Sequence, residues 1–136
     1  MAIAAIAAGA VILREGPVTW WLAAIAGHVG SALLAYALIA IAAVLGSAGA
    51  DRASDDPDFG VSCVLGASVG ALLASAVLAR RDGARDAGTT VALAAGLTGA
   101  AAMLALSAGW LDAEHGLSVA LGAGVVIVRN SGRRCR

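Results

Sequence analysis

Residues 58–70 read DFGVSCVLGASVG, and this stretch carries the chain from an acidic segment into a long apolar run. The apolar part is built from glycine, alanine, serine and valine rather than from large side chains. Small residues let helices approach one another closely inside a membrane. The stretch therefore predicts one end of a membrane-spanning helix that packs tightly against its neighbours, with Ser62 about one turn past the boundary.

The composition supports a membrane protein. The 136 residues are 60% hydrophobic and 13% charged, and the mean hydropathy is +0.89. Soluble domains are about 45–50% apolar and about 25% charged, so this chain has too little polar surface for a water-soluble globule. The formal net charge is zero, which gives no support to a nucleic-acid partner. We expect the lipid bilayer as the main partner.

Apolar segments predict an all-α, polytopic bundle in a single domain over residues 1–136, with four full helices and a short first one. The short helix is predicted at 2–13, the full spans at 18–46, 59–79, 88–111 and 113–128, and a basic tail at 129–136. Twelve residues give about 18 Å of helix, against a hydrocarbon core of about 30 Å. We therefore expect the chain to begin inside a helix whose outer half precedes Met1.

The arginines predict an orientation. If segments 14–17, 80–87 and 129–136 face the cytoplasm, eight of the nine basic residues lie there and only Arg52 lies outside. Such an excess follows the positive-inside rule. It predicts a multi-pass protein of the plasma membrane with a cytoplasmic C-terminus. The outer segments then carry Asp51, Asp55, Asp56, Asp58, Asp112 and Glu114.

This orientation places Ser62 and His115 at similar depth below the outer surface, because each lies near the outer end of a helix that runs inward. A hydroxyl and an imidazole at matched depth are the parts of a serine nucleophile and its general base. The amides at the start of the 59–79 helix favour negative charge near Ser62, where an oxyanion would form. The alternatives are a serine that packs or bonds a backbone carbonyl and an interfacial histidine.

Three other polar residues are candidates for the surroundings of this pair. Asp112 precedes His115 by three residues and could orient the imidazole on a helix, or it could be a solvated loop acid. His28 lies near the middle of the 18–46 span, either hydrogen-bonded across the bundle or lining a path. Tyr36 could approach the layer of Ser62 or serve only in packing. Two isolated cysteines make no metal site, so no metal or cofactor is expected.

These residues resemble the rhomboid intramembrane serine proteases. Gly60-Val61-Ser62 is similar to the family's G-x-S motif, and His115 is similar to its catalytic histidine near the start of the last core helix. The resemblance implies that Gly60 and Cys63 border the substrate or oxyanion region. It also implies close helix packing at Gly70, Ser118 and Gly122, and the small size of Gly66 predicts the same for that position.

More narrowly, the pattern GHVGS…DFGVS…H resembles actinobacterial rhomboid-like membrane proteins, with its first part at 27–31. The implied function is hydrolysis of peptide bonds in transmembrane substrates near the outer face by a Ser62–His115 dyad. The chain departs from the family in having Cys63 where glycine usually follows the serine, and Gly66 where an aromatic residue often stands. An earlier helix of the family normally supplies His and Asn side chains near the oxyanion, and this sequence does not contain it. These missing donors, together with Gly66, favour the alternative of an inactive protein that binds client transmembrane helices. A third alternative is a small transporter subunit with a path lined by His28.

Overall fold

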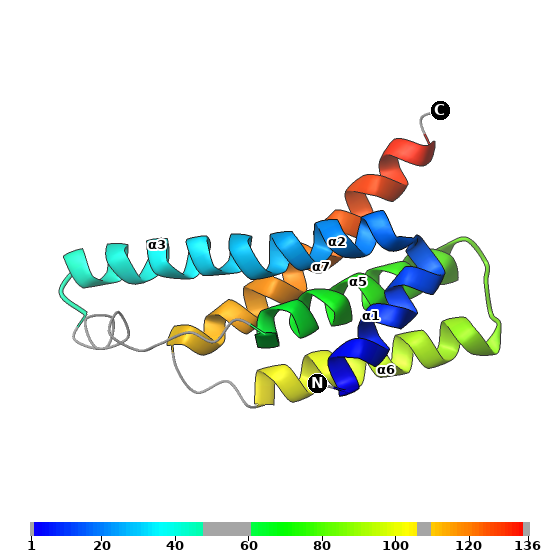
Figure 1. Ribbon diagram of the computed structural model, residues 1–136, viewed down its shortest axis with the longest axis horizontal. Helices are drawn as coiled ribbons and strands as arrows, with labels where there is room; N and C mark the ends of the chain where they lie inside the picture. The colour runs from blue at the N-terminus through cyan, green and yellow to red at the C-terminus, as the bar shows by residue number, and fades with distance from the viewer. Residues whose placement is uncertain (1, 48–60, 106–109, 135–136) are drawn as a thin grey trace.

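The computed structural model describes residues 2–47, 61–105 and 110–134, and every regular element in these ranges is a helix (Figure 1). The expected all-α class is therefore confirmed for the described part of the chain. The helices are α1 (Ala2–Glu15), α2 (Pro17–Ile25), the π-helical turn η1 (Ala26–Gly30), α3 (Ser31–Val44), α5 (Val61–Arg81), α6 (Ala87–Ala105) and α7 (Trp110–Arg134).

Elements α2, η1 and α3 follow one another without a break and form one rod of 28 residues, Pro17–Val44. Gly16 separates it from α1 with φ of 87°, a conformation that glycine adopts without steric cost. Pro17 then occupies the first helical position, where its missing N–H costs no hydrogen bond. Figure 1 shows the α3 end of this rod projecting beyond the other helices.

Two helices in the described ranges are long and apolar enough to cross a membrane, Pro17–Val44 and Ser62–Arg81. Helix α5 has 21 residues, or about 31 Å at ~1.5 Å per residue, which matches a hydrocarbon core of about 30 Å. Helix α6 is apolar over the shorter stretch Ala87–Ala101. By length and composition, the structure thus has two candidate membrane spans.

Helix α5 lies at the centre of the bundle and packs against α7, α6, α1 and the α2–η1 segment (Figure 1). Two glycines allow its closest contact, with α7. A Cβ on Gly70 would lie 1.9 Å from the carbonyl oxygen of Val119, and a Cβ on Gly122 would lie 2.0 Å from that of Ala67. Both distances are impossible for a real side chain, so these positions set how closely the two backbones approach. Gly70 and Gly122, which the sequence predicts as close-packing positions, both lie at this contact.

The last helix is longer than the predicted 113–128 span. Helix α7 begins at Trp110 and continues to Arg134, so the segment around Asp112 does not interrupt it, and most of the predicted tail is helical. Acidic residues in the first turn and arginines in the last turn both favour a helix, because they complement its dipole. Trp110 and Leu111 therefore belong to this helix and not to the preceding 88–111 span.

The other predicted boundaries differ by smaller amounts. Helix α1 continues two residues past the expected 2–13 segment to Glu15, and α5 extends to Arg81 rather than ending at 79. The start of the predicted 59–79 span lies outside the described residues. Asp86 is the N-cap of α6, because its side chain accepts a hydrogen bond of 2.8 Å from the backbone N–H of Thr89.

Candidate functional site

Ser62 and His115 are in direct contact. Ser62 lies in the first turn of α5, His115 lies in the second turn of α7, and the Ser62 Oγ is 2.6 Å from the His115 Nε2. The two helices run parallel, because Cys63 bonds Glu114 near their starts while Leu78 and Asn130 line one pocket near their ends. The proximity expected from matched depth is therefore present. The catalytic role of the pair stays a prediction.

This contact has the geometry of a nucleophile and its base, which requires a heavy-atom separation of about 2.6–3.2 Å. With the ring proton on Nδ1, the Nε2 of His115 accepts the Ser62 hydroxyl proton. Both side chains are only partly buried, so a reactant can reach them. Ser118 helps to fix the turn that carries the histidine, since its hydroxyl donates a 2.7 Å hydrogen bond to the carbonyl oxygen of His115.

The start of α5 supplies the electrostatics of the site. The first N–H groups of a helix have no partner within it, and they favour negative charge together with the helix dipole. Ser62 is the second residue of α5, so charge that develops on a group bound at its Oγ lies close to these donors. Gly60, predicted to border the same region, lies outside the described residues.

A buried carboxylate accompanies the pair, and sequence reasoning placed it wrongly. Glu114 was expected among the acids of an outer segment, yet its side chain is 1% exposed. Its Oε1 accepts hydrogen bonds from the Ser31 hydroxyl and from the Cys63 thiol, each at 3.2 Å. A signal was available in the spacing: Glu114, Ser118, Gly122 and Val126 are four residues apart and all are buried, which marks one face of a helix.

Cys63 is fully buried beside the candidate nucleophile. Its side chain points to Glu114 rather than to the partly exposed side where Ser62 and His115 meet. Cys63 therefore borders the site through its backbone, and its thiol belongs to the buried layer between α5 and α7. Gly66, one turn further along α5, is also buried, in agreement with the predicted packing position.

The structure does not bring His28 or Tyr36 to the pair. His28 is exposed on η1 because the preceding residue, Gly27, takes the buried position, where a Cβ would lie 2.2 Å from that of Ala67. The expectation of a histidine hydrogen-bonded across the bundle, or lining an internal path, is corrected accordingly. Tyr36 is 40% exposed. It follows Ser31, which already reaches the level of Glu114, by five residues, or about 7.5 Å along the helix.

Asp112 lies within α7, which gives it the helical spacing to His115 that the prediction required. Its side chain lies outside the described part of the structure, so its proposed orienting role stays a prediction. Within the described ranges, no group of three histidine, cysteine or acidic side chains could hold a metal ion.

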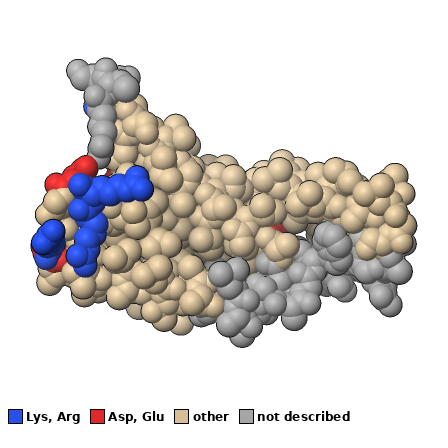
Figure 2. All heavy atoms as spheres, turned by 180° about the vertical axis from the view of Figure 1, so that it is seen from behind, with Lys and Arg blue, Asp and Glu red and all other residues tan. Residues whose placement is uncertain are grey.

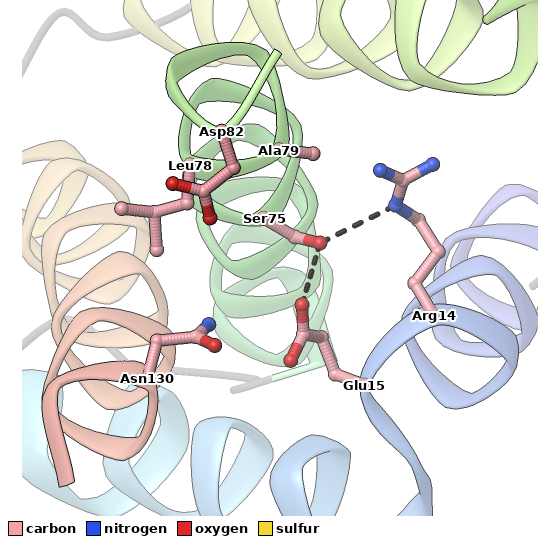
Figure 3. Close-up of a pocket in the computed structure, with 7 residues that line it drawn as sticks. All are labelled: Arg14, Glu15, Ser75, Leu78, Ala79, Asp82 and Asn130. Carbon is pink, nitrogen blue, oxygen red and sulfur yellow. Dashed lines mark hydrogen bonds between the residues drawn. The ribbon is translucent and has the colours of Figure 1, made fainter. Parts of the chain in front are cut away.

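A second polar cluster lies at the opposite end of the bundle (Figure 3). The Ser75 hydroxyl donates a 2.6 Å hydrogen bond to Glu15 and accepts one of 3.3 Å from the Arg14 Nε. Glu15 also pairs with Arg133 at 3.7 Å, and Arg14 reaches the Thr89 hydroxyl at 3.4 Å. These contacts join α1 to α5, α6 and α7 around a cavity of about 290 Å³.

Charged side chains gather at this end (Figure 2). Arginines at the ends of α1, α5 and α7 lie there together with Asp82 and Asp86, whereas the dyad end shows one described acid, Glu114. Among the described residues, charged side chains therefore surround the cavity at one end, whereas the hydrogen-bond donors to the buried Glu114 at the other end are uncharged.

Comparison of the chain with models of protein families, with curated proteins and with solved structures gives no match.

Proposed function

We propose that this chain is a rhomboid-like integral membrane protein that hydrolyses peptide bonds of transmembrane substrates with Ser62 as nucleophile and His115 as general base. The observation that carries the proposal is the 2.6 Å contact between the Ser62 Oγ and the His115 Nε2 at the start of two parallel helices. The resemblance of the Gly60-Val61-Ser62 and His115 motifs to the rhomboid proteases supports the same assignment.

Exposed apolar surface and charge distribution support the membrane part of the proposal. Large apolar side chains are exposed along α3, among them Leu33 at 68% and Val44 at 87%, and contiguous apolar surface of this kind marks contact with lipid or protein. The described arginine side chains lie at one end, which supports a cytoplasmic location for that end and for the C-terminus of α7 by the positive-inside rule. The dyad then lies near the outer face of the plasma membrane.

An apolar cleft between α1 and α6 supports a helical substrate. It has a volume of about 570 Å³, and its floor is formed by α5 through Leu65, Val69 and Leu72. Ile6 of α1 and Val91 of α6 stand on its two sides. Leu65, on the floor of the cleft, lies three residues after Ser62 on α5. A transmembrane segment that enters from the bilayer could therefore lie along α5 with one end near the dyad.

The chemistry follows from this placement. The Ser62 Oγ attacks the peptide carbonyl carbon as its proton passes to the His115 Nε2, and the carbonyl oxygen takes the negative charge near the amides of α5. The imidazolium then gives the proton to the amine nitrogen as the C–N bond breaks, which leaves an ester on Ser62. Water, deprotonated by His115, hydrolyses the ester and restores the hydroxyl. General-base assistance of this kind contributes about 10²–10⁴-fold in rate.

A fluorophosphonate probe tests the proposal in detergent-solubilised protein. Wild type should be labelled at Ser62, and Ser62→Ala should not be labelled. His115→Ala should be labelled at least about 10²-fold more slowly than wild type. Ser68→Ala is the matched control, because Ser68 is a buried α5 hydroxyl that accepts a bond from Trp20 and lies away from the dyad. Equal labelling of wild type and Ser62→Ala would rule out Ser62 as the nucleophile.

The second candidate function is the binding of client transmembrane helices without cleavage, and the apolar cleft is the observation that favours it. Under this reading, Val91→Trp should abolish a cellular phenotype by filling the cleft, while Ser62→Ala should leave the phenotype intact. Loss of the phenotype in Ser62→Ala, with protein levels unchanged, would favour catalysis. The transporter alternative loses the residue on which it depended, since His28 is exposed on the outside of the bundle.

A further inference from the structure

Burial of the Glu114 carboxylate costs free energy of folding. Its side chain is 1% exposed, and a buried polar group costs free energy unless hydrogen bonds compensate it. The described arginines all belong to the far end of the bundle, near Glu15 and the ends of α5 and α7. Glu114 is therefore held by neutral donors, and a chain that needed only a packed core here would be served by an apolar side chain.

The two donors come from two different helices. Ser31 begins α3, and its hydroxyl lies between the carbonyl oxygen of Gly27 and the Glu114 Oε1. Cys63 lies in the first turn of α5 and donates to the same oxygen. A single carboxylate oxygen of α7 thus joins three helices at one level of the bundle.

The position of these residues in the sequence connects them to the dyad. Cys63 follows Ser62 directly, and Glu114 precedes His115 directly. Neighbouring residues of a helix point about 100° apart, since a turn holds 3.6 residues. When Cys63 and Glu114 face each other in the buried layer, the rotation of both helices is fixed, and Ser62 and His115 then meet on the partly exposed side.

We infer that Glu114 is the positioning residue of the Ser62–His115 pair, acting through hydrogen bonds to Cys63 and Ser31 that fix the rotation and depth of α7 relative to α5. This inference rests on the proposed function. Glu114 does not touch the reacting atoms, and its contribution is to hold the imidazole within hydrogen-bond reach of the hydroxyl. Misplacement of a catalytic group by about 1 Å can cost on the order of 10² in rate.

Three variants test the inference through the rate of fluorophosphonate labelling at Ser62. Glu114→Leu keeps the bulk but removes the acceptor, and it should slow labelling at least tenfold. Glu114→Gln keeps an acceptor oxygen and should label within about threefold of wild type, because a carboxamide oxygen accepts hydrogen bonds as a carboxylate oxygen does. Ser75→Ala is the matched control: it removes a buried α5 hydroxyl that bonds Glu15 at the far end, and it should label at the wild-type rate.

A double-mutant comparison separates positioning from loss of stability. In wild type, His115→Ala should slow labelling strongly. In the Glu114→Leu background, the same substitution should have little further effect, because the histidine is already out of reach. An equal cost of His115→Ala in both backgrounds, or wild-type labelling by Glu114→Leu, would overturn the inference.

Two further arms keep the result decisive. If Glu114→Leu fails to fold, Cys63→Ala and Ser31→Ala each remove one donor from the same oxygen, and each should slow labelling severalfold; wild-type rates in both would overturn the inference. The wild-type arm reports on the proposed function separately. Absence of Ser62 labelling in wild type overturns the proposed function and this inference with it, whereas labelling that is insensitive to Glu114 overturns the inference alone.

Discussion

Each end of the bundle contains a glutamate that bonds to α5, and the two differ in what surrounds them. Glu15 accepts a hydrogen bond from Ser75 and pairs with Arg133, in an open and charged setting. Glu114 accepts from Cys63 and Ser31 in a layer with no described arginine, and its side chain is 1% exposed. The Glu15 side chain lines a cavity and is 10% exposed, whereas the Glu114 side chain is enclosed between helices.

This difference suggests different roles: the contacts of Glu15 hold the helices together, whereas those of Glu114 set the position of His115. At the arginine end, Arg14, Glu15 and Arg133 offer several redundant contacts, so the loss of one leaves others in place. At the dyad end, one oxygen of Glu114 accepts both donors. A small change there moves a residue adjacent to His115, whereas a similar change at Glu15 moves no candidate catalytic group. The predictions below test this contrast.

The largest effect is expected midway between the two ends, at Gly122. A methyl group there would lie 2.0 Å from the carbonyl oxygen of Ala67, so Gly122→Ala must push α5 and α7 apart. We expect a loss of stability at or above the upper end of the ~1–3 kcal/mol range for overpacking, and loss of Ser62 labelling. Thermal unfolding in detergent measures the first effect.

Gly124→Ala is the control for this change, because a Cβ at Gly124 meets nothing within 4 Å. It should be neutral or should stabilise α7 by up to about 1 kcal/mol through higher helix propensity. Equal destabilisation by the two substitutions would show that the close approach of α5 and α7 is not what holds them in register.

The second effect compares the two glutamates directly. Glu114→Ala removes the acceptor that the Ser31 hydroxyl and the Cys63 thiol share in a buried layer, and this loss should cost about 1–3 kcal/mol. Glu15→Ala should cost about 1 kcal/mol, because the Arg133 half of its ion pair is 55% exposed and contributes little, while Ser75 loses one hydrogen-bond acceptor. Thermal unfolding at low and high salt distinguishes them further: the cost of Glu15→Ala should shrink at 1 M salt, where screening extends only ~3 Å. An equal salt response at both sites would remove the contrast.

The matched depth of Ser62 and His115 could be anticipated from the sequence, whereas the rotation that turns the two side chains toward each other could not. Arginine placement predicts an orientation of the helices, and this orientation predicts that Ser62 and His115 lie at the same level, in agreement with their 2.6 Å contact. The small residues Gly70 and Gly122 could be anticipated as well, because close helix approach in a membrane needs them.

The rotation of each helix about its own axis was harder to predict from the sequence. His28 lies close to the level of Ser31, yet it faces outward because Gly27 takes the inner position. Glu114 was assigned to an outer segment on the acidic character of its neighbours, while its spacing to Ser118 and Gly122 placed it on the buried face. The depth of a residue in the membrane follows from hydropathy and charge. The side of the helix that faces the bundle depends on which residues pack against the other helices, and the sequence of one helix does not show this.

A smaller effect is expected at the arginine end from Arg133→Gln. The Arg133 side chain is 55% exposed and lies 3.7 Å from Glu15, so its removal should cost at most ~1 kcal/mol and leave Ser62 labelling unchanged. Ser75 still donates to Glu15 after this change, which limits the loss. A decrease in labelling comparable to that of Glu114→Leu would mean that the two ends are coupled, contrary to the separation of roles argued above.

The smallest effect is expected at Asp86, which caps α6 outside the predicted spans. The hydrogen bond from the backbone N–H of Thr89, followed by that from the Thr89 hydroxyl, holds the pKa of Asp86 below its usual value. The folded chain therefore binds fewer protons here than the unfolded chain. The stabilisation is fully present above the ordinary carboxyl pKa of about 4, and it is lost as the pH falls through the lower folded value.

Asp86→Asn should accordingly show a flatter dependence of unfolding temperature on pH than wild type between about pH 5 and pH 2, while the two should differ little in Ser62 labelling at neutral pH. Asparagine still caps a helix, so the fold is kept and only the titrating group is removed. Because Thr89 also accepts from Arg14, an identical pH dependence in both proteins would show that the Arg14 contact, rather than the charge on Asp86, holds the start of α6 at this end.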